Sequence, residues 1–285
     1  MKLYKYMSEN VALEFIKHPL LRITPRQALN DPFECLPSTS IKNKLELHIE
    51  KDVRPNLKEK QVIIIEEIEK FMKLHGIISL TESPDNLLMW SHYGEEHKGM
   101  VVEFNIDEKN PFSLFNTNQV HNESDGKFGR VSYRKSREYP YNITTNSIKD
   151  IRYYYYLSKA DEWIYEKEYR YITPFSLVNY IKKDNEKSIV NCLLEHEALR
   201  DTWLNSHKTN ELFLININEC CIGNIFLGAN ANIDKYTKAF KDAEVGDYRK
   251  NYYSSFTSSY LNVMQAEIDP DRYELKFNNL NNKKC

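Results

Sequence analysis

The sequence lacks the short signatures of several common enzyme classes. It contains no GxxxxGK[ST] phosphate-binding loop and no GxGxxG dinucleotide fingerprint. It also contains no HExxH zinc-binding helix and no GxSxG nucleophile elbow. These absences disfavour a P-loop ATPase, a Rossmann dehydrogenase, a zincin protease and a common serine hydrolase.

Cysteine and long apolar runs are scarce as well. The 5 cysteines form an odd set without regular spacing, and the adjacent pair Cys220 and Cys221 lacks the CxxC spacing of a zinc site. This indicates a reducing compartment with buried thiols, because a disulfide framework needs paired cysteines. The N-terminal MKLYKYMSEN has no apolar core of a secretory signal, and no apolar run approaches the roughly 20 residues that span a bilayer. We therefore expect a cytoplasmic protein without a membrane partner.

Charge is nearly balanced over the whole chain. The formal net charge of -2 argues against nucleic-acid binding through bulk charge, but a local basic groove stays open. The run Tyr153 to Tyr156 lies within a locally positive stretch, and aromatic rings can stack on bases. A helix with aromatic side chains on two faces would give the same pattern. The positive residues of this stretch are Arg130, Arg134, Lys135, Arg137, Arg152 and Lys159.

The order of apolar patterns predicts one α+β domain over residues 1–285. A charged helical insertion is expected at about 41–75, and an Asn- and Lys-rich tail is expected to fray from about 265. Strands are expected at 2–6, 20–24, 77–81, 100–106, 130–134, 163–172, 212–219 and 220–228, and helices at 9–17, 86–97, 151–160, 184–207 and 234–244, with a loop at 107–129.

A turn is predicted at Asn30, Asp31 and Pro32. Proline fixes φ, and Asn and Asp side chains accept hydrogen bonds from nearby backbone. With Glu34 close by, the turn itself is interpreted as structural, while the loop that flanks it is expected to bind a ligand.

The most informative stretch is WIYEKEYR at 163–170. In a strand, residues two apart share a face, so Glu166 and Glu168 are expected to point the same way. Two carboxylates held close together repel unless a cation or ligand uses them. Arg170 could neutralise one through a bidentate pair and leave the other free to act. The plainer alternative is a solvated strand face, with Tyr165, Tyr169 and Tyr171 on the opposite face.

Two further groups of residues are candidates for a site. Trp90, His92 and Tyr93 stand together in MWSHYGEEH, where His92 could be a ligand or a general base. The ordinary alternative is a core tryptophan beside a hydrogen-bonded helical histidine. Near the N-terminus, the tyrosines of KLYKY and Arg22 could line a pocket, or could belong to an edge strand with an exposed arginine.

Taken together, five blocks resemble a bacterial family of uncharacterised domains. They are LYKY, ALNDPFE, LLMWSHYGEEHKGMVVEF, VSY and WIYEKEYR, and the resemblance covers residues 3 to about 228. Their layout is also similar to that of the ADP-ribosyltransferase superfamily. That resemblance implies an ADP-ribosyltransferase-like fold, in which a split, mostly antiparallel sheet with helical insertions clasps NAD.

The resemblance also implies roles for individual residues. Glu168 looks like the catalytic glutamate with Glu166 as its upstream partner, although the reverse assignment stays open. Tyr4 or Tyr6 would take the first-strand place, where the superfamily usually has His or Arg. An aromatic ring would stack on nicotinamide, and Arg22 would reach the pyrophosphate. The residues expected to bind NAD are Tyr4, Tyr6, Arg22, Asn30, Asp31, Trp90, His92 and Tyr93, with Trp90 or Tyr93 as the stacking ring.

The resemblance implies an ADP-ribosyltransferase that uses NAD as a substrate. It would be a toxin of a toxin–antitoxin, toxin–antitoxin–chaperone or phage-defence system, with a cognate antitoxin as a partner. RNA or DNA is favoured over protein as the acceptor. One alternative is a metal-dependent nuclease in which Glu166, Glu168, Asp31 and Glu34 gather a divalent cation. The other is a non-enzymatic module that binds a nucleotide or a partner protein.

Overall fold

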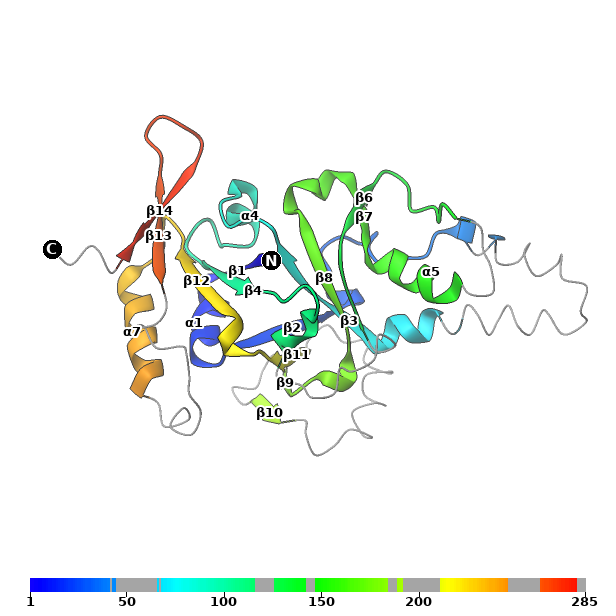
Figure 1. Ribbon diagram of the computed structural model, residues 1–285, viewed down its shortest axis with the longest axis horizontal. Coiled ribbons are helices and arrows are strands. Elements are labelled where there is room, and N and C mark those ends of the chain that lie inside the picture. Colours follow the sequence, from blue (N-terminus) through cyan, green and yellow to red (C-terminus); the bar gives the residue numbers. More distant parts are fainter. Residues whose placement is uncertain are drawn as a thin grey trace, which may run out of the picture.

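The computed structural model describes residues 1–41, 43–44, 66, 68–115, 126–141, 147–183, 189–191, 211–245 and 262–280. They form helices around a large mixed sheet, which confirms the α+β class (Figure 1). No helix in this part of the chain has the length and apolar character needed to cross a membrane.

The large sheet is antiparallel except where β12 pairs with β13 in parallel. Its main path runs in the order β10-β9-β11-β2-β3-β1-β4-β12-β13-β14, while off this path β8 pairs with β3 and β5 pairs with β8. The strands are β1 (Lys2–Met7), β2 (Leu20–Pro25), β3 (His75–Thr81), β4 (Met100–Asn105), β5 (Lys127–Arg130), β8 (Glu168–Pro174), β9 (Tyr180–Lys183), β10 (Ile189–Asn191), β11 (Glu211–Asn216), β12 (Ile222–Leu227), β13 (Val263–Ile268) and β14 (Leu275–Asn279). A separate parallel pair consists of β6 (Ser132–Arg134) and β7 (Ser158–Ala160).

The sheet divides at β3. Along its whole length β3 pairs with β8, from His75 opposite Pro174 to Thr81 opposite Glu168. Strand β2 pairs with the beginning of β3, at Gly76 and Ile77, whereas β1 pairs only with its end, at Thr81. Strands β1 and β2 therefore diverge from β3 and lead into separate halves of the sheet. In the gap between them, Lys5 Nζ donates a hydrogen bond to the Ser79 carbonyl oxygen at 2.9 Å.

Helices cover the sheet on both sides. Helices α1 (Glu9–Lys17) and α7 (Ile233–Val245) pack on each other and on the main core, and α5 (Ser147–Tyr156) lies beside β8 over a second core (Figure 1). Alternation along β3 and β8 explains the two cores, because Ile78 and Tyr171 face the first while Ile77 and Ile172 face the second. A third, smaller core forms where Trp90 of α4 (Leu87–His92) meets β1, β4 and β12.

Several elements differ from the sequence expectations. Residues 189–191 form β10, paired with β9, where a helix was expected; the rest of that expected helix lies outside the described residues. Residues 127–130 form β5 inside the expected loop. The tail expected to fray contains the hairpin β13–β14 because β12 offers β13 a free edge. Residues 68–74 of the expected insertion are helical, and most of the insertion also lies outside the described residues.

The join between β1 and β4 requires a glycine at position 99. A Cβ atom built there would overlap the Met7 carbonyl oxygen, which belongs to the backbone and cannot rotate away. We expect Gly99→Ala to lower the free energy of unfolding by about 1–3 kcal/mol. Urea denaturation with Gly129→Ala as control tests this, because a Cβ at Gly129 meets only the flexible end of Leu157, at 3.0 Å. Equal stability of the two variants would contradict the expectation.

Candidate functional site

A cavity of about 420 Å³ lies where the sheet divides. We call it the split-sheet cavity. Its size falls in the range of small-molecule sites, roughly 300–1,000 Å³. Most of the residues singled out from the sequence line it, namely Tyr4, Tyr6, Arg22, Asn30, His92, Tyr93, Glu166 and Glu168. They come from β1, β2, the turn after β2, α4 with the residue that follows it, and the WIYEKEYR stretch.

The two glutamates point into one place, but not because they share a strand face. Glu166 ends a 3₁₀ helix, η3 (Asp161–Glu166), and Glu168 begins β8. Between them Lys167 adopts the left-handed conformation, with φ 44°. The end of β3 fixes this turn, since Thr81 Oγ1 donates a hydrogen bond to the Glu166 carbonyl oxygen at 2.5 Å. The strand expected over 163–172 is therefore wrong up to residue 167, while the convergence of the carboxylates is correct.

Both carboxylates belong to a buried set of charged side chains that we call the ionic cluster. Lys159 of β7 lies at its centre. The Lys159 Nζ atom is 2.6 Å from Glu166 Oε2, 3.1 Å from Glu34 Oε1 and 3.5 Å from Glu168 Oε2. All members are at most 9% exposed, so water screens their charges weakly. The ionic cluster consists of Glu34, Lys159, Glu166, Glu168 and Arg170.

Arg170 neutralises Glu168 in the bidentate manner expected for one of the two glutamates. Its Nε and Nη2 atoms donate to Glu168 Oε1 and Oε2, each at 2.8 Å. It also contacts Glu34 and donates from Nη1 to the Tyr156 carbonyl oxygen at 2.8 Å. Charge-assisted, bidentate pairs of this kind are stronger than hydrogen bonds between neutral groups. Glu166 is the glutamate that Arg170 leaves unpaired.

These contacts separate the two glutamates electrostatically. Burial alone would raise the pKa of Glu168, but Arg170, helped by Lys159, outweighs burial and lowers that pKa to about 2. Burial raises the pKa of Glu166, and Lys159 only partly opposes it. Burial would lower the pKa of Lys159, yet Glu168, Glu34 and Glu166 together raise it. Glu168 is thus held firmly ionised, whereas the charge on Glu166 is less well compensated.

Tyr93 and His92 form the wall of the split-sheet cavity next to Glu166. The Tyr93 hydroxyl donates a hydrogen bond to Glu166 Oε1 at 2.7 Å, and burial together with this carboxylate raises the pKa of Tyr93. The exposed His92 ring lies 6.4 Å from the Tyr93 ring and 6.2 Å from the Tyr165 ring. Of the two aromatic rings proposed to stack on a ligand, only Tyr93 reaches the cavity.

Trp90 does not line the split-sheet cavity. Its side chain is 0% exposed, and Nε1 donates to the Pro84 carbonyl oxygen at 2.8 Å. The Tyr6 ring packs against it edge-on at 5.3 Å, and the Tyr6 hydroxyl donates to the Ser83 carbonyl oxygen at 3.0 Å. Trp90 is therefore a core residue that packs behind the cavity wall, which is the alternative that the sequence had left open for it. Tyr4 is half-buried and donates to Glu103 Oε2 at 3.3 Å.

Positive charge lies on the β1 and β2 side of the same cavity. Lys5 and Arg22 both line it from the diverging strands. Burial lowers the pKa of Lys5, although Glu168 opposes the change. The split-sheet cavity thus joins a cationic wall to the ionic cluster.

The turn after β2 is structural, as expected. The Asp31 carboxylate accepts a hydrogen bond from the Phe33 backbone N–H at 2.8 Å, and Asp31 lines a neighbouring cavity instead of the split-sheet cavity. Glu34 does reach the ionic cluster, but Lys159 and Arg170 fill the space in which three carboxylates would hold a cation. In the described ranges no group of three or more His, Cys, Asp or Glu residues is arranged to hold a metal. The metal site of the alternative nuclease hypothesis is not supported by this arrangement of the described residues.

Sequence reasoning missed the central position of Lys159 and the contribution of Lys5. Lys159 was noted only as part of a positive stretch, and no spacing rule connects it with Glu34. The carboxylates of Glu34, Glu166 and Glu168 could have signalled a buried cation among them, because buried like charges require an opposite charge.

Comparisons with known proteins give a match over one segment of the chain. No curated protein and no solved structure gives a significant match. Residues 89–171 match the family described as "Protein of unknown function (DUF2971)". That match lies within the span for which a family of uncharacterised domains was expected, and it includes Tyr93, Lys159, Glu166, Glu168 and Arg170.

Proposed function

We propose that this chain is an ADP-ribosyltransferase that takes NAD as its substrate and transfers ADP-ribose to a macromolecule, with RNA or DNA favoured over protein. One observation carries the proposal. Tyr4, Arg22 and Glu168 lie far apart in the sequence, yet they line the same cavity. The cavity lies where β1 and β2 diverge from β3, and this division of the sheet supports an ADP-ribosyltransferase-like fold.

The distribution of charge in the split-sheet cavity suits a dinucleotide. With all its members ionised, the ionic cluster has three negative and two positive charges, so its net charge is -1. Lys5 and Arg22 offer positive charge on the other wall. A diphosphate fits the cationic wall, and the nicotinamide riboside end, whose positive charge lies on the nicotinamide ring, fits the ionic cluster. Buried charges act strongly on such a ligand because little water screens them.

The proposed chemistry follows from this orientation. The bond between nicotinamide and ribose C1′ breaks, and its electron pair leaves with nicotinamide, so positive charge develops on the ribose. Glu166 faces this charge and stabilises it, because a preorganised carboxylate in a dry site favours the charged transition state. The acceptor nucleophile then bonds to C1′ and gives up its proton to a nearby base. Tyr93 packs beside the nicotinamide, and Arg170 holds Glu168 in place beneath the ribose.

The assignment of Glu166 reverses the first choice made from the sequence. Arg170 pairs both oxygen atoms of Glu168, whereas Glu166 shares the single ammonium of Lys159 with two other carboxylates. The less compensated charge acts more strongly on the cavity. We accordingly place Glu166 against the reacting ribose and treat Glu168 as a positioning residue.

The proposed biological role rests on the resemblance noted in the sequence. The chain would act in the cytoplasm as a toxin of a toxin–antitoxin, toxin–antitoxin–chaperone or phage-defence system. A cognate antitoxin would then be the partner that restrains it. Covering the mouth of the split-sheet cavity would be sufficient for that restraint.

Incubation with NAD tests the proposed function directly. A ligand that binds only the folded state stabilises it by about 2.7 kcal/mol at a hundred times its Kd, so NAD is expected to raise the melting temperature. When NAD is labelled on its adenylate group, the label is expected to appear on RNA or DNA. Nicotinamide is expected as the other product. AMP and ATP serve as matched controls for simple nucleotide binding. If NAD neither raises the melting temperature nor is consumed with RNA, DNA or protein present, the proposal is wrong.

A further inference from the structure

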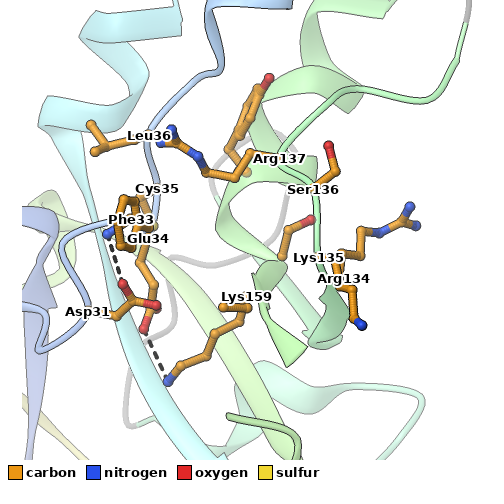
Figure 2. A pocket seen from close by; sticks show the side chains of 13 residues that line it. Asp31, Phe33, Glu34, Cys35, Leu36, Arg134, Lys135, Ser136, Arg137 and Lys159 are labelled. Carbon is orange, nitrogen blue, oxygen red and sulfur yellow. Dashed lines mark hydrogen bonds and ion pairs between the residues drawn. The ribbon is translucent and has the colours of Figure 1, made fainter. Parts of the chain in front are cut away.

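A second cavity, of about 280 Å³, adjoins the ionic cluster. It lies between the turn at residues 31–36 and the segment at residues 134–137, and we call it the rim cavity. Glu34 and Lys159 line both cavities, so this ion pair forms the partition between them. Figure 2 shows the two segments facing each other across the rim cavity, with Glu34 and Lys159 joined by a dashed line at its base. A group seated here lies one ion pair away from the proposed NAD site.

Three cationic side chains of the segment at residues 134–137 line the rim cavity. Arg134 is half-buried, and Lys135 and Arg137 are exposed. Among the described residues, none of the three forms an ion pair with a carboxylate. Figure 2 shows Arg137 reaching across toward Leu36 while Arg134 points outward. This positive charge is therefore available to an anionic ligand.

An exposed aromatic ring stands at the same cavity. Phe33 is 61% exposed although it is a large apolar side chain, and the Arg137 guanidinium lies 5.5 Å from its ring centroid. On the other side, the Arg134 guanidinium lies 5.4 Å from the Tyr154 ring centroid. Aromatic rings interleaved with arginines bind single-stranded nucleic acid, with the bases stacked on the rings and the phosphates near the cations.

The surface continues into a third cavity with the same chemistry. This cavity, of about 520 Å³, shares Ser158 with the rim cavity. Its charged residues are Lys127, Arg130 and Asp150, and Arg130 pairs with Glu82 at 3.2 Å, so the segment at residues 134–137 holds the larger surplus of positive charge. Its aromatic side chains are Tyr139, Tyr141, Tyr153 and Tyr154. The two cavities together can follow a strand over more than one nucleotide.

We propose that the rim cavity seats one nucleotide of a single-stranded nucleic-acid acceptor, with its base on Phe33 and its phosphates on Arg134, Lys135 and Arg137. Single-stranded form follows from the small volume, because a base pair does not fit in a cavity of about 280 Å³. RNA and DNA share the phosphodiester and base that this site recognises. The assignment of this nucleotide as the acceptor rests on the proposed function, whereas its binding does not.

Binding is measured by fluorescence anisotropy of a labelled single-stranded oligonucleotide with the full chain in the absence of NAD. RNA and DNA of the same sequence are the two arms, and a duplex is the comparison. Phe33→Ala is expected to weaken binding about tenfold, the cost of one lost base–aromatic stack. The triple variant Arg134→Gln, Lys135→Gln, Arg137→Gln is expected to reduce the slope of log Kd against log salt by about 2, since each phosphate contact contributes roughly 0.7.

A matched control removes the same charge elsewhere. The triple variant Lys17→Gln, Lys98→Gln, Arg272→Gln also changes the net charge from -2 to -5, but its positions do not line the three cavities named above. It is expected to bind like the wild type. Equal loss in both triple variants, unchanged binding in the rim-cavity variants, or tighter binding of duplex than of single strand would each overturn the proposal.

The same variants separate this inference from the proposed function. NAD-induced stabilisation is expected to persist in both triple variants, because the changed side chains do not line the split-sheet cavity. One outcome is that oligonucleotide binding is lost in the rim-cavity variants, while NAD neither raises the melting temperature of the wild type nor is consumed. That outcome would support nucleotide binding in the rim cavity and overturn the proposed function. If the protein transfers ADP-ribose to a protein acceptor but does not bind oligonucleotides, nucleotide binding in the rim cavity is overturned and the use of NAD as a substrate is retained.

Discussion

Glu166→Gln is expected to lower the turnover of NAD by about 10²–10³-fold while the KM for NAD changes little. Removing one preorganised group that acts on developing charge has an effect of this size in other enzymes. A group that acts mainly in the transition state changes kcat more than KM. The measurement is nicotinamide release with single-stranded RNA or DNA present.

The fold is expected to tolerate this change. Burial raises the pKa of Glu166, so the site holds the charge of this side chain less firmly than that of Glu168, and glutamine is a neutral isostere. The Tyr93 hydroxyl and Lys159 stay near the new amide, and Lys159 keeps two other carboxylates as partners. The urea midpoint of Glu166→Gln should therefore remain close to that of the wild type.

Glu168→Gln supplies the matched comparison. Its low pKa, about 2, means that the site requires the ionised form, because the bidentate contact with Arg170 depends on two negative oxygen atoms. This variant is expected to lose stability and activity together. Full NAD turnover in Glu166→Gln would contradict the assignment. A stable Glu168→Gln variant that alone loses turnover would restore the assignment first made from the sequence.

Much of the fold was predictable because it is local. The strands β1, β2, β3 and β4 and the helices α1 and α7 follow from apolar periodicity and from the turn residues between them. The turn at Asp31 was predictable for the same reason, since an Asp side chain bonds its own backbone two residues on. Each of these features depends on neighbours within a few positions.

The features that were missed depend on distant partners. The expectation that Glu166 and Glu168 converge was correct, but the strand period behind it was wrong, because the two lie on either side of a turn fixed by Thr81, 85 positions earlier in the chain. Lys159 reaches the carboxylates because β7 pairs with β6, a short parallel pair without a strong local pattern. Strand β13 forms on the edge of β12 despite an Asn- and Lys-rich neighbourhood. Tertiary pairing overrides composition in these places.

Arg170→Met is expected to lower the free energy of unfolding at pH 7 by about 3–5 kcal/mol, because removing one member of a buried ion pair leaves an uncompensated charge. Arg170 is 1% exposed and contacts two carboxylates as well as the Tyr156 carbonyl. After the change, Lys159 alone faces Glu34, Glu166 and Glu168. Arg272→Met, at a side chain that is 72% exposed, should cost little and serves as the control.

The pH dependence of this loss distinguishes lost charge from lost packing. In the wild type the pKa of Glu168 lies below its ordinary value of 4.5, so its charge stabilises the fold above pH 4.5, and that contribution disappears as the pH falls toward 2. Without Arg170, burial raises this pKa, so the ionised carboxylate costs stability at neutral pH and the cost vanishes on protonation. The deficit of Arg170→Met should thus be largest near pH 7 and shrink toward pH 3. A deficit that is constant with pH would contradict this account.

A double variant tests whether the stability lost in Arg170→Met comes from the charge that Glu168 keeps without its partner. In Glu168→Met, Arg170→Met both members of the bidentate pair become apolar side chains of similar length, and buried ion pairs replaced in this way often lose little stability. Lys159 then faces only Glu34 and Glu166, and Tyr133 keeps its backbone contact at position 168, where its hydroxyl accepts the N–H at 2.8 Å. We expect urea midpoints to place the double variant above Arg170→Met. If the urea midpoints of the double variant and of Arg170→Met are equal, Arg170 stabilises the fold through Glu34 and the Tyr156 carbonyl. The pairing with Glu168 then contributes little to the free energy of unfolding.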